Sequence, residues 1–457
     1  MKKLLQILTI GAFAISTGRA SAQGMITTWA GTGEAGYSGD NDIASNAKIG
    51  EPKDLAFDAA GNMYILDIAN SVIRKVNATT NIITTVAGTG TAGYNGDNIP
   101  ATTAMLSSPS YLSVDAAGNI YVTDFGNARV RKISTSGIIT TIAGNGDVTD
   151  HGDNGPATAA GIAGPQGICV DAAGNVYVST ISNSVIRKIA AGTGIITTIA
   201  GTGAAGFGGE GGPATAAALN SPSAICLDHS GNLLIADQYN GLLRKVNLST
   251  NIITTFAGIQ GMLTYFGENC DPMVAGLGEV DGLCVDDNDD VYDCDFSCSC
   301  RKLIKATNTL SIVAGDSVIT GYNGDGITAT TAWLNMPFGV RVDHSGNIYI
   351  ADRGNHRIRR ATQPGFTVTG VQNTYNSTAN EPVLYPNPTS GAITVSVTDA
   401  MQYAQATVIN VSGAIVYSSV LKDKNTNIDL SGQPAGIYLL SVKSDKGNYV
   451  KQITVTK

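Results

Sequence analysis

Six acidic residues recur along the chain at a nearly constant spacing, each after a glycine or close to one. They stand 56–58 residues apart, at Asp40, Asp97, Asp153, Glu210, Glu268 and Asp325. Carboxylate oxygens are preferred ligands of Ca²⁺, so acids gathered on one face could collect cations. An acid can equally cap the turn after it, as in Gly152-Asp-Asn-Gly-Pro-Ala-Thr158. We favour capping, with Ca²⁺ binding as the alternative, and expect no other metal or cofactor.

Histidine and nucleophile motifs are scarce. The four histidines are His151, His229, His344 and His356, whereas a zinc site needs several converging His or Cys ligands. His229 and His344 both stand in Asp-His-Ser-Gly-Asn segments, which are predicted to be hairpin turns. No Gly-x-Ser-x-Gly nucleophile elbow occurs in the chain. These residues favour a non-catalytic protein.

The acids belong to a repeat that covers most of the chain. One half-repeat, a hydrophobic residue followed by an Asp-x-x-Gly-Asn type turn, recurs at Asp58, Asp115, Asp171, Asp228, Asp286 and Asp343. The other half, an Ile-Thr-Thr-x-Ala-Gly type run, recurs around Trp29, Val86, Ile142, Ile199, Phe256 and Val313. Within residues 109–153 the pattern predicts four short antiparallel strands, at 110–114, 120–123, 130–133 and 138–142. Short strands and Gly-rich turns at such a period are typical of a β-propeller with one repeat per blade.

The phase of the repeat predicts a closed ring. The chain opens with a second half-repeat at residues 26–31 and ends its last first half at Arg360. We therefore expect residues 26–30 to pair as the outermost strand with residues 358–361. That pairing would leave no free sheet edge.

A family resemblance supports this architecture. The unit Asp-x-x-Gly-Asn-x-Tyr-Val-x-Asp-x-x-Asn-x-x-Ile-Arg-Lys resembles the NHL repeat, and the Thr-Gly-x-Ala-Gly-Tyr-x-Gly-Asp loop is similar to its long bacterial version. The resemblance spans residues 25–361 and implies an all-β, six-bladed propeller. Most such domains bind proteins or other ligands, and a minority are enzymes.

Two recurring sets are interpreted as scaffold. An Asp recurs nine residues after each turn Asp, at Asp67, Asp124, Asp237, Asp295 and Asp352, with Thr180 as the exception. An Arg recurs at Arg74, Arg131, Arg187, Arg244 and Arg359, and we expect these arginines to pair with those carboxylates.

Function on a repeat scaffold should lie where the copies differ. The residues after each repeat's Pro (Val280 in the fifth repeat) enter the innermost strand at the mouth of the central channel. These residues vary among the repeats. Together with Arg341, a charged residue further along the innermost strand, they give the candidate ligand-binding set Lys53, Asp54, Tyr111, Gln166, Ser223, Asp281, Phe338 and Arg341. Arg341 stands where other repeats have Ala56, Ser113 or a cysteine, so it needs a carboxylate or water.

The seven cysteines form two groups. Cys169, Cys226 and Cys284 share one innermost-strand position and are interpreted as small buried hydrophobic residues. Cys270, Cys294, Cys298 and Cys300 crowd into the fifth repeat, where export favours disulfides over a metal site. We expect a Cys270–Cys298 bridge first and a Cys294–Cys300 bridge second.

The two ends of the chain carry export signals. Residues 1–22 read as a signal peptide, with Lys2 and Lys3, a short apolar stretch and an Ala20-Ser-Ala22 cleavage site. A polar linker is expected at 363–383. Residues 384–457 open with Leu384-Tyr-Pro-Asn-Pro-Thr-Ser-Gly391 and resemble the type A sorting domain of the type IX secretion system, a small β-sandwich. The alternative for this tail is an independent carbohydrate-binding sandwich.

Charge limits the partners. The total charge is −8; residues 1–22 carry +3 and residues 384–457 carry six Lys against four Asp, which leaves −13 for residues 23–383. An acidic ring argues against nucleic acid, and no stretch beyond the signal peptide is long and apolar enough to span a bilayer. We expect a monomeric, secreted or outer-membrane-surface propeller, exported through the periplasm, that binds a protein, peptide or glycan. The alternative is a metal-dependent hydrolase or lyase with its site in the channel.

Overall fold

The computed structural model describes residues 24–362 except 297, and residues 382–456 except 386, 388, 398–402, 411–414 and 445–446. The expected signal peptide at 1–22 and nearly all of the expected linker at 363–383 lie outside the described residues. The chain divides into two compact units, at residues 1–364 and 365–457. The described residues form strands and short 3-10 turns, and none of their helices is long and apolar enough to cross a membrane.

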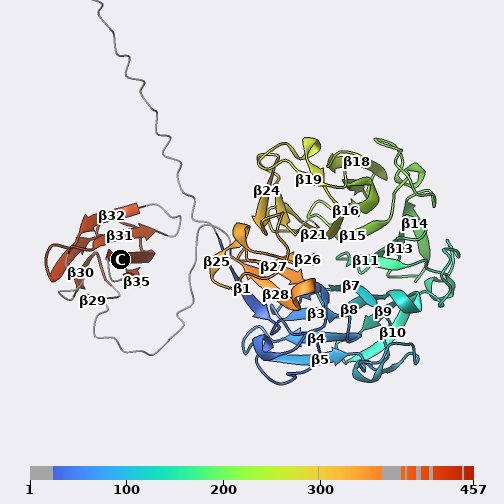
Figure 1. Ribbon diagram of the computed structural model, residues 1–457, viewed down its shortest axis with the longest axis horizontal. Helices are drawn as coiled ribbons and strands as arrows, with labels where there is room; N and C mark the ends of the chain where they lie inside the picture. Colours follow the sequence, from blue (N-terminus) through green and yellow to red (C-terminus); the bar gives the residue numbers. More distant parts are fainter. Residues whose placement is uncertain are drawn as a thin grey trace, which may run out of the picture. The chain divides into compact units, whose positions relative to one another are not determined.

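The first unit is a six-bladed propeller, as the sequence predicts (Figure 1). Each blade is a four-stranded antiparallel sheet. Blade 1 consists of β2 (Pro52–Phe57), β3 (Met63–Asp67), β4 (Val72–Val76) and β5 (Ile83–Ala87). Blade 2 consists of β7 (Pro109–Val114), β8 (Ile120–Asp124), β9 (Arg129–Ile133) and β10 (Ile138–Ala143), with β6 (Ile99–Pro100) at its edge. Blade 3 consists of β11 (Pro165–Val170), β12 (Val176–Thr180), β13 (Val185–Ile189) and β14 (Ile196–Ala200).

The second half of the ring repeats this order. Blade 4 consists of β15 (Pro222–Leu227), β16 (Asn232–Asp237), β17 (Leu242–Asn247) and β18 (Ile252–Ala257). Blade 5 consists of β21 (Val280–Val285), β22 (Val291–Asp295), β23 (Cys300–Ile304) and β24 (Thr309–Ala314), preceded by the small hairpin β19 (Tyr265–Phe266) and β20 (Gly276–Leu277). Blade 6 consists of β26 (Pro337–Val342), β27 (Ile348–Asp352), β28 (Arg357–Ala361) and β1 (Met25–Ala30), with β25 (Ile327–Thr328) at its edge.

The N-terminal strand closes the ring, which confirms the predicted pairing. β1 runs antiparallel to β28, with Ile26 opposite Ala361 and Thr28 opposite Arg359. The innermost strands contact one another in a closed cycle of β2, β7, β11, β15, β21 and β26. The last blade is thereby completed by both ends of the propeller sequence, which removes the free edge that an open array would present.

Burial explains the sequence of the strands. Every residue of β3, β8, β12 and β27 is buried, because neighbouring blades cover both faces of each sheet. The first three residues of each of these strands are therefore apolar or aromatic, with no polar–apolar alternation. The hairpin between the first two strands of blade 1 is held by Asp58, whose carboxylate accepts hydrogen bonds from the Asn62 amide and the Tyr64 hydroxyl. Gly61 adopts φ +77° in this turn, a conformation that favours glycine.

The propeller has two faces, the long-loop face and the hairpin face. The long-loop face carries the connections between blades and the turns between second and third strands. Short 3-10 turns lie in the connections between blades, at η1 (Ala44–Asn46), η2 (Ala101–Thr103), η4 (Ala157–Ala159), η5 (Ala214–Ala216), η7 (Pro272–Val274) and η8 (Ala329–Thr331). Others come directly after second strands, at η3 (Phe125–Asn127), η6 (Gln238–Asn240) and η9 (Arg353–Asn355). The hairpin face, on the other side, carries the turns between first and second strands.

The second unit contains two sheets around one core. One sheet has the order β29 (Val383–Tyr385), β30 (Ala392–Ser396) and β33 (Asn425–Asp429). The other has the order β32 (Ile415–Val420), β31 (Gln405–Asn410), β34 (Gly436–Ser444) and β35 (Gly447–Val455). Ile393, Val408 and Leu440 lie in their shared hydrophobic core. This arrangement is the small β-sandwich that the sequence predicts.

Candidate functional site

A bulge at the start of each innermost strand aims the variable residues at the channel. Pro52 pairs with Asp67, but the register shifts before Asp54 pairs with Leu66. Equivalent shifts come after Pro109, Pro165, Pro222, Val280 and Pro337. A bulge re-aims side chains locally, so one or two residues of every blade face the axis. Adjacent innermost strands lie so close that a Cβ on Gly282 would come 2.0 Å from the Phe338 carbonyl oxygen.

Lys53 lies at the centre of this set. Its Nζ donates to Ser110 Oγ at 3.3 Å and to Gln166 Oε1 at 3.1 Å. The same ammonium lies 5.2 Å from the ring centroid of Tyr111 and 5.5 Å from that of Phe338. Burial lowers the pKa of Lys53 to about 8, and Asp281 counteracts part of this shift. Residues from four blades therefore meet at one amine, as the sequence predicts.

Tyr111 and Asp281 connect opposite sides of the ring. The Tyr111 hydroxyl donates to the Asp281 backbone carbonyl at 2.7 Å, from blade 2 to blade 5. Asp281 Oδ1 accepts from Gln238 Nε2 at 3.0 Å, whereas its buried Oδ2 has no hydrogen-bond partner among the described residues. Burial raises the pKa of Asp281 to about 7, despite the opposing effect of Lys53. The carboxylate thus offers a free acceptor atom beside a buried amine.

Three other predicted residues, Asp54, Arg341 and Ser223, have structural partners. Asp54 is fully buried, and it accepts from the Leu112 backbone N–H at 3.1 Å and pairs with Arg341 at 3.1 Å. Arg341 therefore finds the carboxylate that its position requires. Ser223 donates to the Val280 carbonyl at 2.7 Å, which links blades 4 and 5. Burial raises the pKa of the Cys284 thiol to about 12, so this channel cysteine is not a thiolate.

Sequence reasoning missed the outer rim of the mouth. The residue directly after each second strand also varies among the blades, as Ile68, Phe125, Ile181, Gln238, Phe296 and Arg353. Phe296 packs edge-on against Phe338, with ring centroids 5.2 Å apart. The Arg353 guanidinium lies over the Phe338 ring, 5.0 Å from its centroid. Arg353 also pairs with Glu51 at 2.6 Å. Comparing the residue after Asp67 and its equivalents would have found this second variable set.

A buried arginine in each blade holds the loops that shape the mouth. The six are Arg74, Arg131, Arg187, Arg244, Arg301 and Arg359, all at most 1% exposed. In five blades the arginine lies 3.1–3.9 Å from the acid that ends the second strand, which confirms the predicted pairing for Arg74, Arg131, Arg244 and Arg359 and adds Arg301, whereas Arg187 has no such acid. In the same five blades an aromatic residue of the long loop covers the guanidinium, whose carbon lies 4.8–5.1 Å from the ring centroid. Planar guanidinium suits both contacts.

The loop acids do not cap the turns after them, so the capping interpretation is wrong. Asp40, Asp97, Asp153, Glu210 and Asp325 instead pair with their blade's buried arginine at 2.6–3.4 Å. Asp40, Asp153 and Glu210 also accept a backbone N–H from the fourth strand. The sixth acid, Glu268, accepts one from Ile312 at 3.1 Å. The reason is that an arginine buried in the sheet needs a carboxylate more than an exposed turn needs a cap.

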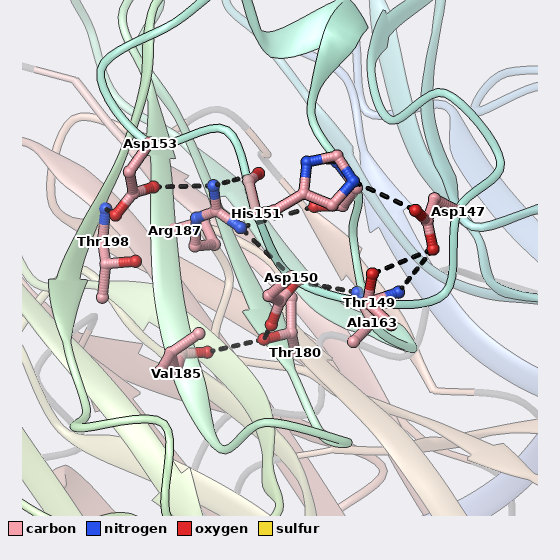
Figure 2. A network of polar contacts seen from close by, with 11 residues as sticks. Asp147, Thr149, Asp150, His151, Asp153, Ala163, Thr180, Val185, Arg187 and Thr198 are labelled. Carbon is pink, nitrogen blue, oxygen red and sulfur yellow. Dashed lines mark hydrogen bonds and ion pairs between the residues drawn. The ribbon is translucent and has the colours of Figure 1, made fainter.

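Blade 3 keeps this network with different residues (Figure 2). Thr180 replaces the usual second-strand acid, and Asp150 replaces the aromatic residue of the loop. Asp150 accepts from Thr180 Oγ1 at 2.7 Å and from the Ala163 N–H at 2.7 Å, and it lies 3.4 Å from Arg187. Figure 2 shows Arg187 between Asp150 and Asp153, with the His151 ring turned toward Asp147. A loop carboxylate has thus taken the place of a strand carboxylate.

The predicted cysteine pairing needs a correction. Cys294 is bonded to Cys300 across the β22–β23 hairpin, while Cys270 and Cys298 are free thiols. The expected Cys270–Cys298 bridge is therefore not formed. Cys270 packs against the core cluster between blades 4 and 5, whereas Cys298 is buried in the cluster between blades 5 and 6. The two thiols therefore pack in different core clusters.

The acids do not assemble into a cation site in the part of the chain that the structure describes. No group of three or more His, Cys, Asp or Glu residues there could hold a metal ion. Each loop acid serves its own blade, and the ring geometry keeps the six apart. The described residues therefore give no observation in favour of a metal-dependent hydrolase or lyase.

Comparisons with known proteins agree with this geometry. The family "Secretion system C-terminal sorting domain" matches residues 383–456, and the NHL repeat family matches residues 334–360. The propeller thus contains an NHL repeat in its sixth blade, and the chain carries a C-terminal sorting domain. The sorting domain indicates export by the type IX system to the cell surface or the outside, and implies interaction with that machinery.

Solved structures share the propeller fold at low sequence identity. A protein of unknown function from Bacteroides thetaiotaomicron is 18% identical, with a TM-score of 0.55, over 74% of this chain and 76% of that chain. An auxiliary nutrient binding protein from the same organism is 17% identical, with a TM-score of 0.54, over 75% of this chain and 77% of that chain. A protein of that description from Bacteroides ovatus is 15% identical, with a TM-score of 0.55 and the same coverage.

One curated relative matches a short segment. Protein SUPPRESSOR OF QUENCHING 1, chloroplastic, from Arabidopsis thaliana is 31% identical over 96 residues, which are 21% of this chain. The match spans 9% of that protein's length.

Proposed function

We propose that this protein is an exported, non-catalytic binding propeller whose ligand docks at the mouth of the central channel on the long-loop face. The observation that carries the proposal is the free Oδ2 of Asp281, a buried carboxylate oxygen beside the Lys53 amine. A buried polar atom without a partner costs free energy; because Oδ2 is buried in the free protein, the ligand gains affinity only by displacing rim side chains and donating a hydrogen bond to it. The ligand is a protein, peptide or glycan that presents an amine or hydroxyl group.

The surrounding residues supply the selectivity. Aromatic rings of Phe296 and Phe338 give apolar contact area, while Gln238 and Arg353 supply polar contacts at the rim. A concave set of apolar residues with a few convergent polar groups is the usual composition of a binding site. Binding is also what the names of two structural neighbours describe for those proteins, the nutrient binding proteins of the two Bacteroides species.

Screening the full-length protein against immobilised glycan and peptide libraries tests the proposal. Asp281→Asn and Phe296→Ala should each abolish the hits, because the first replaces the free acceptor and the second removes rim contact area. His344→Ala, on the hairpin face, serves as the matched control and should bind normally. Hits that survive both mouth substitutions would place the ligand elsewhere, and metal-dependent turnover of any hit would contradict the non-catalytic assignment.

A further inference from the structure

A pocket lies on the hairpin face, between blades 6 and 1. It has a volume of about 230 Å³, and its walls include Trp29, Phe57, Met63 and Tyr349. Trp29 and Phe57 both pack edge-to-face on Tyr349, with centroids 5.6 and 5.0 Å away and interplanar angles of 84° and 72°. Tyr349 is buried and the other two rings are half-buried. The three rings therefore form a partly open aromatic box.

The box exists only at this junction because the repeats differ here. The position of Trp29 holds smaller side chains or a single ring in the other blades, namely Val86, Ile142, Ile199, Phe256 and Val313. The position of Phe57 holds only aliphatic residues elsewhere, namely Val114, Val170, Leu227, Val285 and Val342. Aliphatic residues suffice for folding at both positions, so the fold does not require the aromatic pair.

Other blades show which group this environment accepts. In blades 1, 2, 3 and 5 a third-strand lysine places its ammonium over the second-strand tyrosine, 5.0–5.6 Å from the ring centroid. In two of these blades the ammonium also pairs with the turn aspartate, Lys75 with Asp58 at 3.8 Å and Lys302 with Asp286 at 3.3 Å. An aromatic face and a carboxylate together form an ammonium site.

Blade 6 keeps the ring and the carboxylate but not the lysine. Arg360 stands in the lysine position, and its guanidinium carbon lies 5.2 Å over Trp29 instead. Asp343 accepts from the Tyr349 hydroxyl at 3.2 Å, from the Asn347 side-chain amide at 2.8 Å and from the backbone N–H groups of Ser345 and Asn347, and these partners within the described residues are all uncharged. Tyr349 thus has an arginine, directed to Trp29, in place of the lysine whose ammonium covers the equivalent tyrosine in four other blades.

We propose that the aromatic box of Trp29, Phe57 and Tyr349 binds an alkylammonium group supplied by a ligand. The ring faces attract the charge, Asp343 adds a carboxylate, and the apolar walls accept carbon substituents on the nitrogen. The net charge of −13 on residues 23–383 favours a cationic ligand. Two sources carry this chemistry, a lysine side chain of a protein partner and a small quaternary ammonium compound.

Tryptophan fluorescence provides a direct assay, because the chain has only Trp29 and Trp333. The full-length Trp333→Phe protein should report binding through Trp29 alone. Choline and Nα-acetyl-lysine amide are titrated at constant ionic strength, and the neutral isostere 3,3-dimethylbutan-1-ol is titrated alongside. We expect saturable binding of at least one ammonium probe with a Kd on the order of 1 mM, and none of the isostere. Choline alone would indicate a small quaternary ammonium ligand, and the lysine probe would indicate a protein partner.

Two substitutions that copy other blades make the test specific. Phe57→Val and Arg360→Lys should each weaken binding about tenfold, the first by removing a wall and the second by restoring an internal ammonium. Phe256→Val, at the Trp29-equivalent position of blade 4, is the matched control and should leave binding unchanged. Equal binding of the neutral isostere, no saturable signal from either ammonium probe, or full binding by both variants would overturn the proposal.

Discussion

Asp150 and Thr180 are predicted to be a compensated pair, and exchanging them tests how the blades are stabilised. Asp150→Tyr restores the aromatic loop residue of the other blades but removes the carboxylate that holds Arg187. Thr180→Asp restores the usual second-strand acid but adds a buried carboxylate beside Asp150, whose side chain is 8% exposed. The double variant gives blade 3 the same arrangement as blades 1, 2 and 6.

The structure sets the expected magnitudes. Breaking a buried ion pair usually costs about 3–5 kcal/mol, but Arg187 keeps Asp153 at 2.6 Å, and this acid is 39% exposed. Loss of Asp150 also leaves the Ala163 N–H without its acceptor, which costs about 1–3 kcal/mol. We therefore expect Asp150→Tyr to lower the free energy of unfolding by about 3 kcal/mol. Thr180→Asp should lower it by about 2 kcal/mol through the burial and repulsion of a second charge.

Urea unfolding followed by tryptophan fluorescence measures this, because both tryptophans lie in the propeller. Independent effects would add to about 5 kcal/mol in the double variant, whereas compensation should return it to within about 1 kcal/mol of the wild type. Glu210→Gln in blade 4 serves as a control without a compensating partner. An additive double variant would refute the view that the two positions share one structural role.

Three further predictions concern the titration of the channel, the thiols and the tail. Burial raises the pKa of Asp281 to about 7. The stability of the wild type relative to Asp281→Asn should therefore fall as pH rises from about 4 to about 7. A stability difference that does not change with pH in urea titrations would contradict that pKa shift. A thiol assay on denatured, unreduced protein should find five free cysteines. A count of three would mean that a second bridge, such as Cys270–Cys298, is formed after all. Deleting residues 384–457 should leave a propeller with unchanged thermal unfolding that stays in the periplasm, and surface localisation of the truncated protein in cell fractions would refute the sorting role of the tail.

The architecture could be predicted because the repeat constrains it six times. The spacing of Asp58 and its equivalents gives the blade length, and the half-repeat at residues 26–31 gives the closing strand. Each prediction depends on local patterns that recur, so an ambiguous copy is corrected by its neighbours. The disulfide had no such support, because Cys270 and Cys298 each occur in one repeat alone and the sequence does not show that they pack in different core clusters.

The site was predicted in part for the same reason. The residues after each repeat's Pro made Lys53, Tyr111 and Asp281 visible as variable positions, but the rim residues come after the second strands and were not part of that set. The loop acids were misinterpreted because each acid stands next to its turn in the sequence, whereas its arginine lies 34 residues later, as Arg74 does after Asp40.

Comparison among the repeats would have recovered much of what was missed. The exchange of Tyr for Asp at position 150 coincides with the exchange of Asp for Thr at position 180, in the same repeat. Likewise, Arg360 replaces a lysine in the repeat that contains Trp29. In a repeat protein each copy is a control for the others, so paired departures mark contacts, and a departure without an internal partner marks a candidate ligand site. By that criterion Asp150 with Thr180 and Arg360 with Trp29 are contacts, whereas Phe57, at a position that is aliphatic in the other repeats, is the departure on which the proposed ammonium site rests.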